Sequence, residues 1–251
     1  MNATMKRSPL KKTAPAKRTG TAKRTGTAKK PAPVKSRAVL TISNKNYSSW
    51  SLRGWLLCRL AGLEIEEQVV PLDDPTNRAE LLLLAPSVLV PRLTHHGASV
   101  WDTLAIAEYL AEEFPEAGML PNDRVARAHC RSVSGEIHSG FYNLRSALPM
   151  NLKAKYRNFK IFAGARGDIE RVQAIWGECL DTWGGPFLYK TPTIADAMYA
   201  PVCTRFLTYD VPMTGASKAY CRTIMNWPPM MQWVRAAKKE PAEMEELDME
   251  F

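Results

Sequence analysis

The sequence is poor in the residues that build metal sites and disulfide frameworks. Its five cysteines are scattered along 251 residues without a C-x-x-C pair, and it has only four histidines. That pattern argues against a disulfide-stapled fold and against a structural zinc site. We therefore expect no bound metal and a reducing, cytoplasmic environment.

Long apolar runs are missing as well. No stretch of eighteen apolar residues occurs, and the N-terminus lacks the apolar core of a secretory signal peptide. These absences predict a chain that does not enter a membrane. Hydrophobic residues make up 45% of the chain and charged residues 24%, which is ordinary for a globular protein of one or two domains.

Acidic residues are absent from residues 1–37, although this stretch carries twelve of the 34 Lys and Arg residues. The hexapeptide KRTGTA occurs twice within it, and apart from Met1, Met5, Leu10 and Val34 it has almost nothing to bury. Such a segment cannot offset its ordering entropy, so we expect a disordered basic tail. It is either an arm that makes weak, nonspecific contacts with nucleic acid or another anion, or an extension with no specific role.

Hydrophobic periodicity changes along the rest of the chain. The expected elements are a strand at 38–42, a helix at 51–60, strands at 65–72, 88–93 and from 99 to 101, and a helix at 102–114. From residue 124 onward only helices are expected, at 124–147, 168–182, 194–207 and 216–237. Thr193 to Asp196 is a capping-box variant at the start of the third of these helices.

Three motifs in this order resemble the soluble glutathione transferases. Val90-Pro91 is similar to the family's Val-Pro pair with a cis proline. Asp102-Thr103 is similar to its glutamyl-binding pair at a helix start. Residues 48–53, SSWSLR, resemble the SSCSWR string of the zeta class, the maleylacetoacetate isomerases. Trp50 replaces the zeta cysteine, which weakens the case for true isomerase activity but leaves that activity as an alternative.

The resemblance implies a fold and an assembly. The fold is a thioredoxin-like α/β domain at 38–118 followed by an all-α domain at 119–251, behind the disordered basic extension at 1–37. The expected assembly is a homodimer. The expected activity is transfer of glutathione to a small electrophile, as in detoxification.

The resemblance also implies roles for the motif residues. Ser48 falls at the catalytic serine, where its hydroxyl would donate to the glutathione sulfur and favour the thiolate. Val90, next to Pro91, would bind the cysteine part of glutathione through its backbone. Asp102 and Thr103, at a helix N-terminus, would hold the γ-glutamyl group. Tyr47 and Ser49 stay alternatives for the sulfur contact, and Ser49 is also expected near glutathione.

A second pocket is predicted on the helix at 124–147. His138, Tyr142 and Arg145 have the spacing i, i+4 and i+7, which places them on one helix face. In the fold that this chain resembles, that helix lines the acceptor pocket, so these residues and Tyr47 are candidate electrophile contacts, with Arg145 suited to a carboxylate. The face could instead be solvated or buried between subunits.

The transferase fold also serves proteins without catalysis. The alternative function is therefore a non-catalytic adaptor whose basic tail contacts nucleic acid.

Overall fold

The computed structural model describes residues 38–70 and 89–241. Four strands form one sheet in the order β2-β1-β3-β4. Their bounds are β1 Ala38–Ile42, β2 Ile65–Val69, β3 Arg92–His95 and β4 Ala98–Trp101. β1 pairs with β2 in parallel and with β3 antiparallel, and β4 pairs antiparallel with β3. This small mixed sheet confirms the predicted α/β part of the chain.

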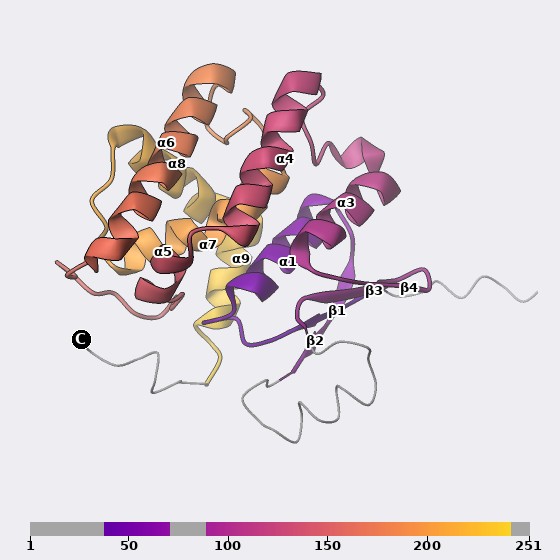
Figure 1. Cartoon of the computed structure of the whole chain (residues 1–251). Helices are drawn as coiled ribbons and strands as arrows, with labels where there is room; N and C mark the ends of the chain where they lie inside the picture. The colour runs from indigo at the N-terminus through magenta and orange to yellow at the C-terminus, as the bar shows by residue number, and fades with distance from the viewer. Residues whose placement is uncertain (1–37, 71–88, 242–251) are drawn as a thin grey trace, which may run out of the picture. The chain divides into compact units, whose positions relative to one another are not determined.

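Two helices cover one face of the sheet (Figure 1). They are α1, Ser49–Leu60, and α3, Thr103–Glu113, and the 3-10 turn η1, Pro115–Ala117, follows α3. Most of the apolar spacing predicted for them is buried, with Leu52 and Leu56 on α1 and Leu110 on α3 fully inaccessible to solvent. The helices thus bury their apolar faces against the sheet.

A glycine sets how closely α1 approaches the loop before β3. A Cβ on Gly54 would lie 2.5 Å from Cγ of Pro91, closer than side-chain atoms can pack. The Val90-Pro91 peptide bond is cis, as the resemblance implied. Because position 54 has no side chain, α1 packs directly onto this cis proline.

The rest of the described chain is helical. The helices are α4 Arg124–Ser139, α5 Tyr142–Ala147, α6 Arg166–Trp183, α7 Ile194–Thr208, α8 Gly215–Asn226 and α9 Pro228–Ala237, with the 3-10 turn η2, Ala163–Ala165, before α6. α7 is buried along its length except at Leu207 and packs against α1, α4 and α8. Figure 1 shows it in the middle of the helical part.

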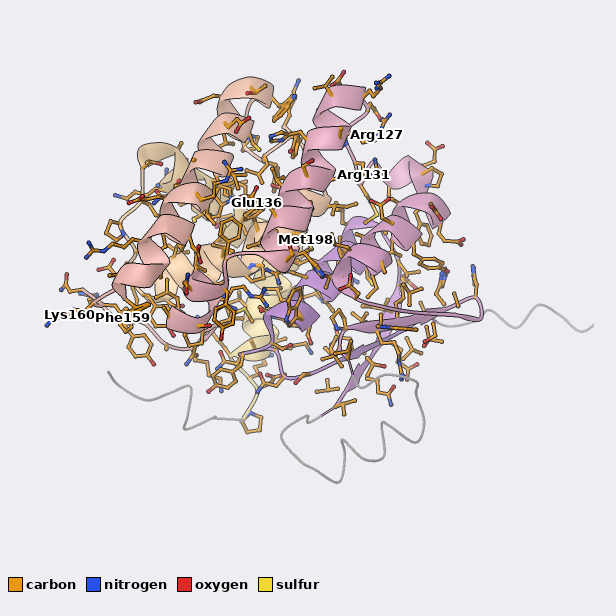
Figure 2. All side chains as sticks on the ribbon, in the orientation of Figure 1. Arg127, Arg131, Glu136, Phe159, Lys160 and Met198 are labelled. Atoms are coloured by element: carbon orange, nitrogen blue, oxygen red, sulfur yellow. The ribbon has the colours of Figure 1, made fainter. Side chains whose placement is uncertain are left out.

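Polar contacts hold α4 to its neighbours. Arg131 forms a bidentate ion pair with Glu108 of α3, and Glu136 forms another with Arg171 of α6. Arg131 and Glu136 are labelled in Figure 2. These pairs are half exposed, so we expect each to contribute about 0.2–1 kcal/mol.

The capping box at the start of α7 is confirmed. Asp196 accepts hydrogen bonds from the backbone N–H of Thr193 at 2.8 Å and from that of Leu188 at 3.1 Å. The hydroxyl of Tyr220 donates to the same carboxylate at 3.1 Å. Asp196 is completely buried, so this one side chain joins α7, α8 and the preceding loop.

Three predicted elements differ from the structure. The helix expected at 124–147 is broken after Ser139, because Phe141 has a left-handed backbone with φ of 59°. The helix expected at 216–237 is broken at Trp227, before Pro228, whose ring cannot continue a helix from the residue before it. The third strand, expected at 88–93, is β3 from Arg92 to His95, and residues 89–91 lie outside it.

Other expectations lie outside the described residues. They include the whole tail at 1–37 and residues 71 and 72 of the second strand, so the roles given to the tail stay predictions, as does the domain boundary at 118. No helix among the described residues combines the length and the apolar character that crossing a bilayer requires.

Candidate active site

A cavity of about 370 Å³ opens where the start of α3, the cis-proline loop and the C-terminal end of α4 meet. It is lined by Trp50, Leu89, Val90, Pro91, Asp102, Thr103, His138 and Ser139. Five of the predicted site residues line it, namely Val90, Pro91, Asp102, Thr103 and His138. The cavity is therefore the place where the sequence motifs converge.

The N-terminus of α3 forms one wall. Asp102 is the N-cap, and its Oδ1 accepts hydrogen bonds from the N–H groups of Leu104 at 2.8 Å and Ala105 at 3.3 Å. Its backbone has φ of 75°, an uncommon conformation for a residue other than glycine. Such strained positions concentrate at binding and catalytic sites.

His138 reaches from α4 to both residues of this motif. Its Nε2 lies 3.0 Å from Oδ2 of Asp102, and its Nδ1 lies 3.3 Å from Oγ1 of Thr103. The acidic and hydroxyl groups predicted to hold a ligand thus contact an imidazole of the helical part.

Ser48 caps the other helix that points at this region. It is the N-cap of α1, its Oγ accepts from the N–H of Ser51 at 3.3 Å, and its hydroxyl donates to Oγ of Ser51 at 2.8 Å. Ser48 is half-buried and does not line the cavity, whereas Trp50, two residues on, does.

Ser49 and Tyr47, the alternatives to Ser48 for the sulfur contact, have different surroundings. Ser49 is buried, and its Oγ accepts a hydrogen bond at 3.2 Å from the guanidinium of Arg205. Tyr47 is half-buried, and its backbone N–H donates to Oδ1 of Asn44 at 2.9 Å. The Oγ of Ser49 is therefore held inside the protein as an acceptor for Arg205.

The loop before Ser48 is tied to the helical part of the chain. Oε2 of Glu240 accepts from the backbone N–H of Lys45 at 2.7 Å and from that of Asn46 at 3.3 Å. Asn46 is fully buried, and its Oδ1 accepts from the N–H of Leu152 at 2.8 Å. These contacts fix the position from which α1 begins.

Trp50 lies between two guanidinium groups. The guanidinium carbon of Arg53 is 4.5 Å from the centre of the Trp50 ring, and that of Arg145 is 4.7 Å away. The His138 ring meets the same indole edge-on at 5.2 Å. Arginine and tryptophan make the strongest cation–π pairs of the common side chains.

A third arginine completes a positive cluster. Arg205 donates to the carbonyls of Arg145 and Leu148 at the end of α5. Arg53 donates through Nε to the carbonyl of Met198 at 2.8 Å, while one of its buried terminal nitrogens has no hydrogen-bond partner among the described residues. None of the three arginines pairs with a carboxylate of the described chain.

The electrostatics of the cluster follow from burial and mutual repulsion. Burial lowers the pKa of Arg53, and the charges of Arg205 and Arg145 lower it further. Burial also lowers the pKa of Arg205, and the charge of Arg145 lowers it further. Burial alone lowers the pKa of Arg145. The cluster is thus a region of uncompensated positive charge beside the Ser48 end of α1.

The predicted face of His138, Tyr142 and Arg145 is only partly present. Because α4 ends at Ser139, Tyr142 belongs to α5 and is 78% exposed, away from the cavity. His138 and Arg145 nevertheless meet at Trp50. The shared helix face was therefore a wrong prediction, although two of its three members contact the same indole.

Sequence reasoning missed Trp50, Arg53 and Arg205 as site residues. Trp50 was noted only as a departure from the zeta string, and Arg53 belongs to that string. Arg205 lies 152 residues after Arg53, and nothing in the local pattern signals that they meet.

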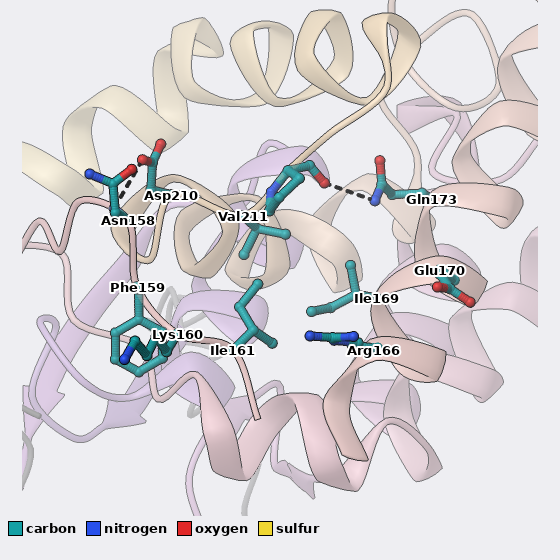
Figure 3. Close-up of a pocket in the computed structure, with 11 residues that line it drawn as sticks. Asn158, Phe159, Lys160, Ile161, Arg166, Ile169, Glu170, Gln173, Asp210 and Val211 are labelled. Atoms are coloured by element: carbon teal, nitrogen blue, oxygen red, sulfur yellow. Dashed lines mark hydrogen bonds between the residues drawn. The ribbon is translucent and has the colours of Figure 1, made fainter. Parts of the chain in front are cut away.

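A larger cavity of about 790 Å³ lies in the helical part (Figure 3). It is bounded by residues 158–161, the start of α6 and residues 210–212. Asn158 donates from its backbone to Asp210 at 3.2 Å, and Gln173 donates to the carbonyl of Pro212 at 3.2 Å. None of the predicted site residues lines it.

Comparison with known proteins finds one family in both halves of the chain. The glutathione S-transferase N-terminal domain matches residues 47–113, and the glutathione S-transferase C-terminal domain matches residues 151–236. Together these matches cover more than half of the chain.

One curated relative is the protein named "Probable maleylacetoacetate isomerase" of Caenorhabditis elegans. It is 31% identical over 107 residues, which are 43% of this chain and 49% of the relative. The chain therefore spans about half the length of that relative.

Solved structures resemble the chain over most of its length. A glutathione transferase homolog from Burkholderia GL BGR1, with bound glutathione, has a TM-score of 0.62 at 23% identity and covers 80% of this chain and 98% of its own. The maleylacetoacetate isomerase of Anaeromyxobacter dehalogenans 2CP-1, with bound glutathione, has a TM-score of 0.58 at 22% identity, covering 82% and 97%. These structures share the fold, and with both domain matches they show that the chain belongs to the glutathione S-transferase family of enzymes.

Proposed function

We propose that this protein activates the thiol of glutathione for attack on a small electrophile. The observation that carries the proposal is the convergence of the cis Val90-Pro91 pair, the Asp102-Thr103 helix start and Trp50 on one cavity. The glutathione bound to the homologous structures supports the same ligand here.

The γ-glutamyl end of glutathione fits the N-terminus of α3. A helix N-terminus attracts a carboxylate through its free N–H groups and partial positive charge. The ammonium group of the ligand would contact Oδ2 of Asp102, the oxygen that now faces His138, since Oδ1 is engaged in capping. The backbone of Val90 would bind the cysteinyl part.

The thiol would lie near the start of α1. A thiol titrates near about 8.5 in water, and nearby positive charge lowers that value. The cluster of Arg53, Arg145 and Arg205 supplies such charge without a carboxylate of the described chain to cancel it. Ser48 is the preferred hydroxyl donor, because it is half-buried whereas Ser49 is buried. Its hydroxyl, which now donates to Oγ of Ser51, would turn to the sulfur when glutathione binds.

The second substrate would meet the thiolate beside Trp50. Arg145 is half-buried there, so an acceptor with an anionic group such as a carboxylate suits this side of the pocket. The thiolate attacks the electrophilic carbon, and the electron pair of the broken bond leaves with the leaving group or moves into a conjugated carbonyl. A homodimer, a cytoplasmic location and a role in detoxification stay predictions.

The test uses serine variants of the full chain. Ser48→Ala should lower kcat for conjugation of glutathione at pH 7 by about tenfold or more, because a hydrogen bond to a charged group contributes about 1.5–3 kcal/mol. Ser132→Ala is the matched control, since Ser132 is exposed on α4 and donates only to the carbonyl of Ala128. Full activity in Ser48→Ala would refute the role of Ser48. Failure of the wild type to bind glutathione at millimolar concentration would refute the proposed function itself.

A further inference from the structure

Two histidines and a glutamate meet at the end of α3 opposite the cavity. His95 ends β3, His96 begins the turn to β4, and Glu113 is the last residue of α3. One ligand atom from each of the three lies within 4.8 Å of the other two. The closest charged contact, between Nδ1 of His96 and Oε2 of Glu113, is 3.8 Å.

Tyr109 contacts one of the two ring nitrogens of His95. Nδ1 of His95 lies 2.9 Å from the Tyr109 hydroxyl, which itself donates to the carbonyl oxygen of His95 at 3.4 Å. In the tautomer in which the hydroxyl donates to this carbonyl, it accepts the N–H of Nδ1. Nε2 of His95 then carries the lone pair that a metal would bind, with the second ring nitrogen held by a hydrogen bond.

His95 is held in place by its surroundings. The residue is only 4% exposed, and its Nδ1 lies 2.9 Å from the Tyr109 hydroxyl, so packing and this contact fix the orientation of its ring.

The other two groups are open to solvent. The side chains of His96 and Glu113 are 62% and 41% exposed. The rings of His95 and His96 stack at 3.8 Å, so His96 must tilt before both rings can direct a lone pair at one point. Its exposure leaves it free to do so, and the same opening admits an ion.

We propose that His95, His96 and Glu113 bind a divalent transition-metal ion of the zinc type, with water in the remaining position. Two imidazoles and one carboxylate form a donor set that zinc accepts at about 2.0–2.2 Å. Tyr109 is the positioning residue that holds the ring of His95.

The ion would have a structural effect. It would join the tip of the β3–β4 hairpin to the end of α3, and α3 rises about 1.5 Å per residue, so Thr103 and the cavity lie roughly 15 Å away. The site is thus separate from the thiol chemistry and does not depend on the proposed function. Binding to the folded state alone raises the midpoint of thermal unfolding.

Within residues 38–70 and 89–241, no other group of three side chains could hold a metal ion. The five cysteines are all buried, and residues 1–37 contain no histidine, cysteine or acidic residue. His129 bonds to Tyr189 through Nδ1 at 2.7 Å and faces Glu178 at 3.5 Å, with no second histidine beside it. His129→Ala is therefore the matched control.

The experiment is calorimetric titration of the EDTA-treated full chain with Zn²⁺, repeated with Co²⁺ for its absorption spectrum. We expect one site of micromolar affinity that is weakened at least about tenfold in Glu113→Gln and His96→Ala and unchanged in His129→Ala. The Co²⁺ spectrum should show nitrogen and oxygen ligation without thiolate bands. Thermal unfolding with and without Zn²⁺ should show a rise in Tm for the wild type and for His129→Ala, and none for Glu113→Gln or His96→Ala.

Some outcomes would overturn the proposal. They are affinity within about twofold of the wild type in Glu113→Gln, thiolate bands in the Co²⁺ spectrum, or no binding below millimolar Zn²⁺. Tm of each variant without metal checks that it folds. Glutathione binding is measured on the same samples. It tests the proposed function independently of whether the metal site exists.

Discussion

The imidazole of His138 lies 3.0 Å from the carboxylate of Asp102, the residue that caps α3. The two residues come from different parts of the fold, and the same ring also contacts the hydroxyl of Thr103. In the proposed function the ammonium group of glutathione binds this carboxylate. The imidazole and the ligand therefore compete for one oxygen atom.

This competition predicts that His138→Ala binds glutathione more tightly. Because a partly exposed ion pair is worth about 0.2–1 kcal/mol, we expect the dissociation constant to fall by a factor of about 1.4 to 5. Isothermal titration calorimetry measures it, with Ser132→Ala on the same helix as the control. Weaker binding in His138→Ala would mean that the histidine contacts the ligand and does not compete with it.

Gly54 and Pro91 predict a steric effect. In Gly54→Ala the new Cβ would lie 2.5 Å from Pro91, so α1 and the cis-proline loop must separate. We expect a loss of about 1–3 kcal/mol in the free energy of unfolding, together with weaker glutathione binding. Chemical denaturation measures the first quantity.

The control for Gly54→Ala is Gly177→Ala on α6, where nothing lies within 4 Å of an added Cβ. Alanine is the better helix former by about 0.8–1 kcal/mol, so this variant should be as stable as the wild type or more so. An equal loss in both variants would contradict a specific clash at Pro91.

Arg145 predicts a preference for charged acceptors. Arg145→Ala should lower kcat/KM at least about tenfold for an electrophile that bears a carboxylate, because a charged hydrogen bond contributes about 1.5–3 kcal/mol. The same variant should change kcat/KM by less than about threefold for a neutral electrophile that is otherwise identical but lacks the carboxylate. Equal losses for both substrates would show that Arg145 acts through the packing of Trp50 and not through the acceptor.

Asp196 predicts a pH effect on stability. Burial raises its pKa from 3.8 to about 6 in the folded protein. Between about pH 4 and pH 6 the folded state therefore holds a proton that the unfolded state has lost, so stability decreases as the pH rises through this window. Relative to Asp196→Asn, the wild type should lose on the order of 2 kcal/mol from pH 4 to pH 7.

Urea unfolding of both proteins across this pH range measures the difference. Asp196→Asn removes the titration, and its lost capping hydrogen bonds should lower stability by the same amount at every pH. If the free energy of unfolding of the wild type instead rises relative to that of the variant as the pH rises, the carboxylate is ionised in the folded state and its pKa is lowered.

Much of the fold was predictable because its signals are local. Apolar spacing indicated α1 and α3, and the run of β-branched and apolar residues indicated β1. The cap residues Asp102 and Asp196 marked two helix starts, because capping depends on residues within one turn. The helix breaks after Ser139 and at Trp227 were missed, since apolar spacing alone continues across them.

The sequence by itself determined the family, the order of the elements and the motif residues that line the cavity. Only the tertiary structure decided that His138 meets Asp102, that Arg53, Arg145 and Arg205 gather around Trp50 and Ser49, and that Glu113 faces the two adjacent histidines. The physical reason is that these contacts join segments far apart in the chain. Their geometry depends on how whole helices pack, which no local pattern of residues encodes.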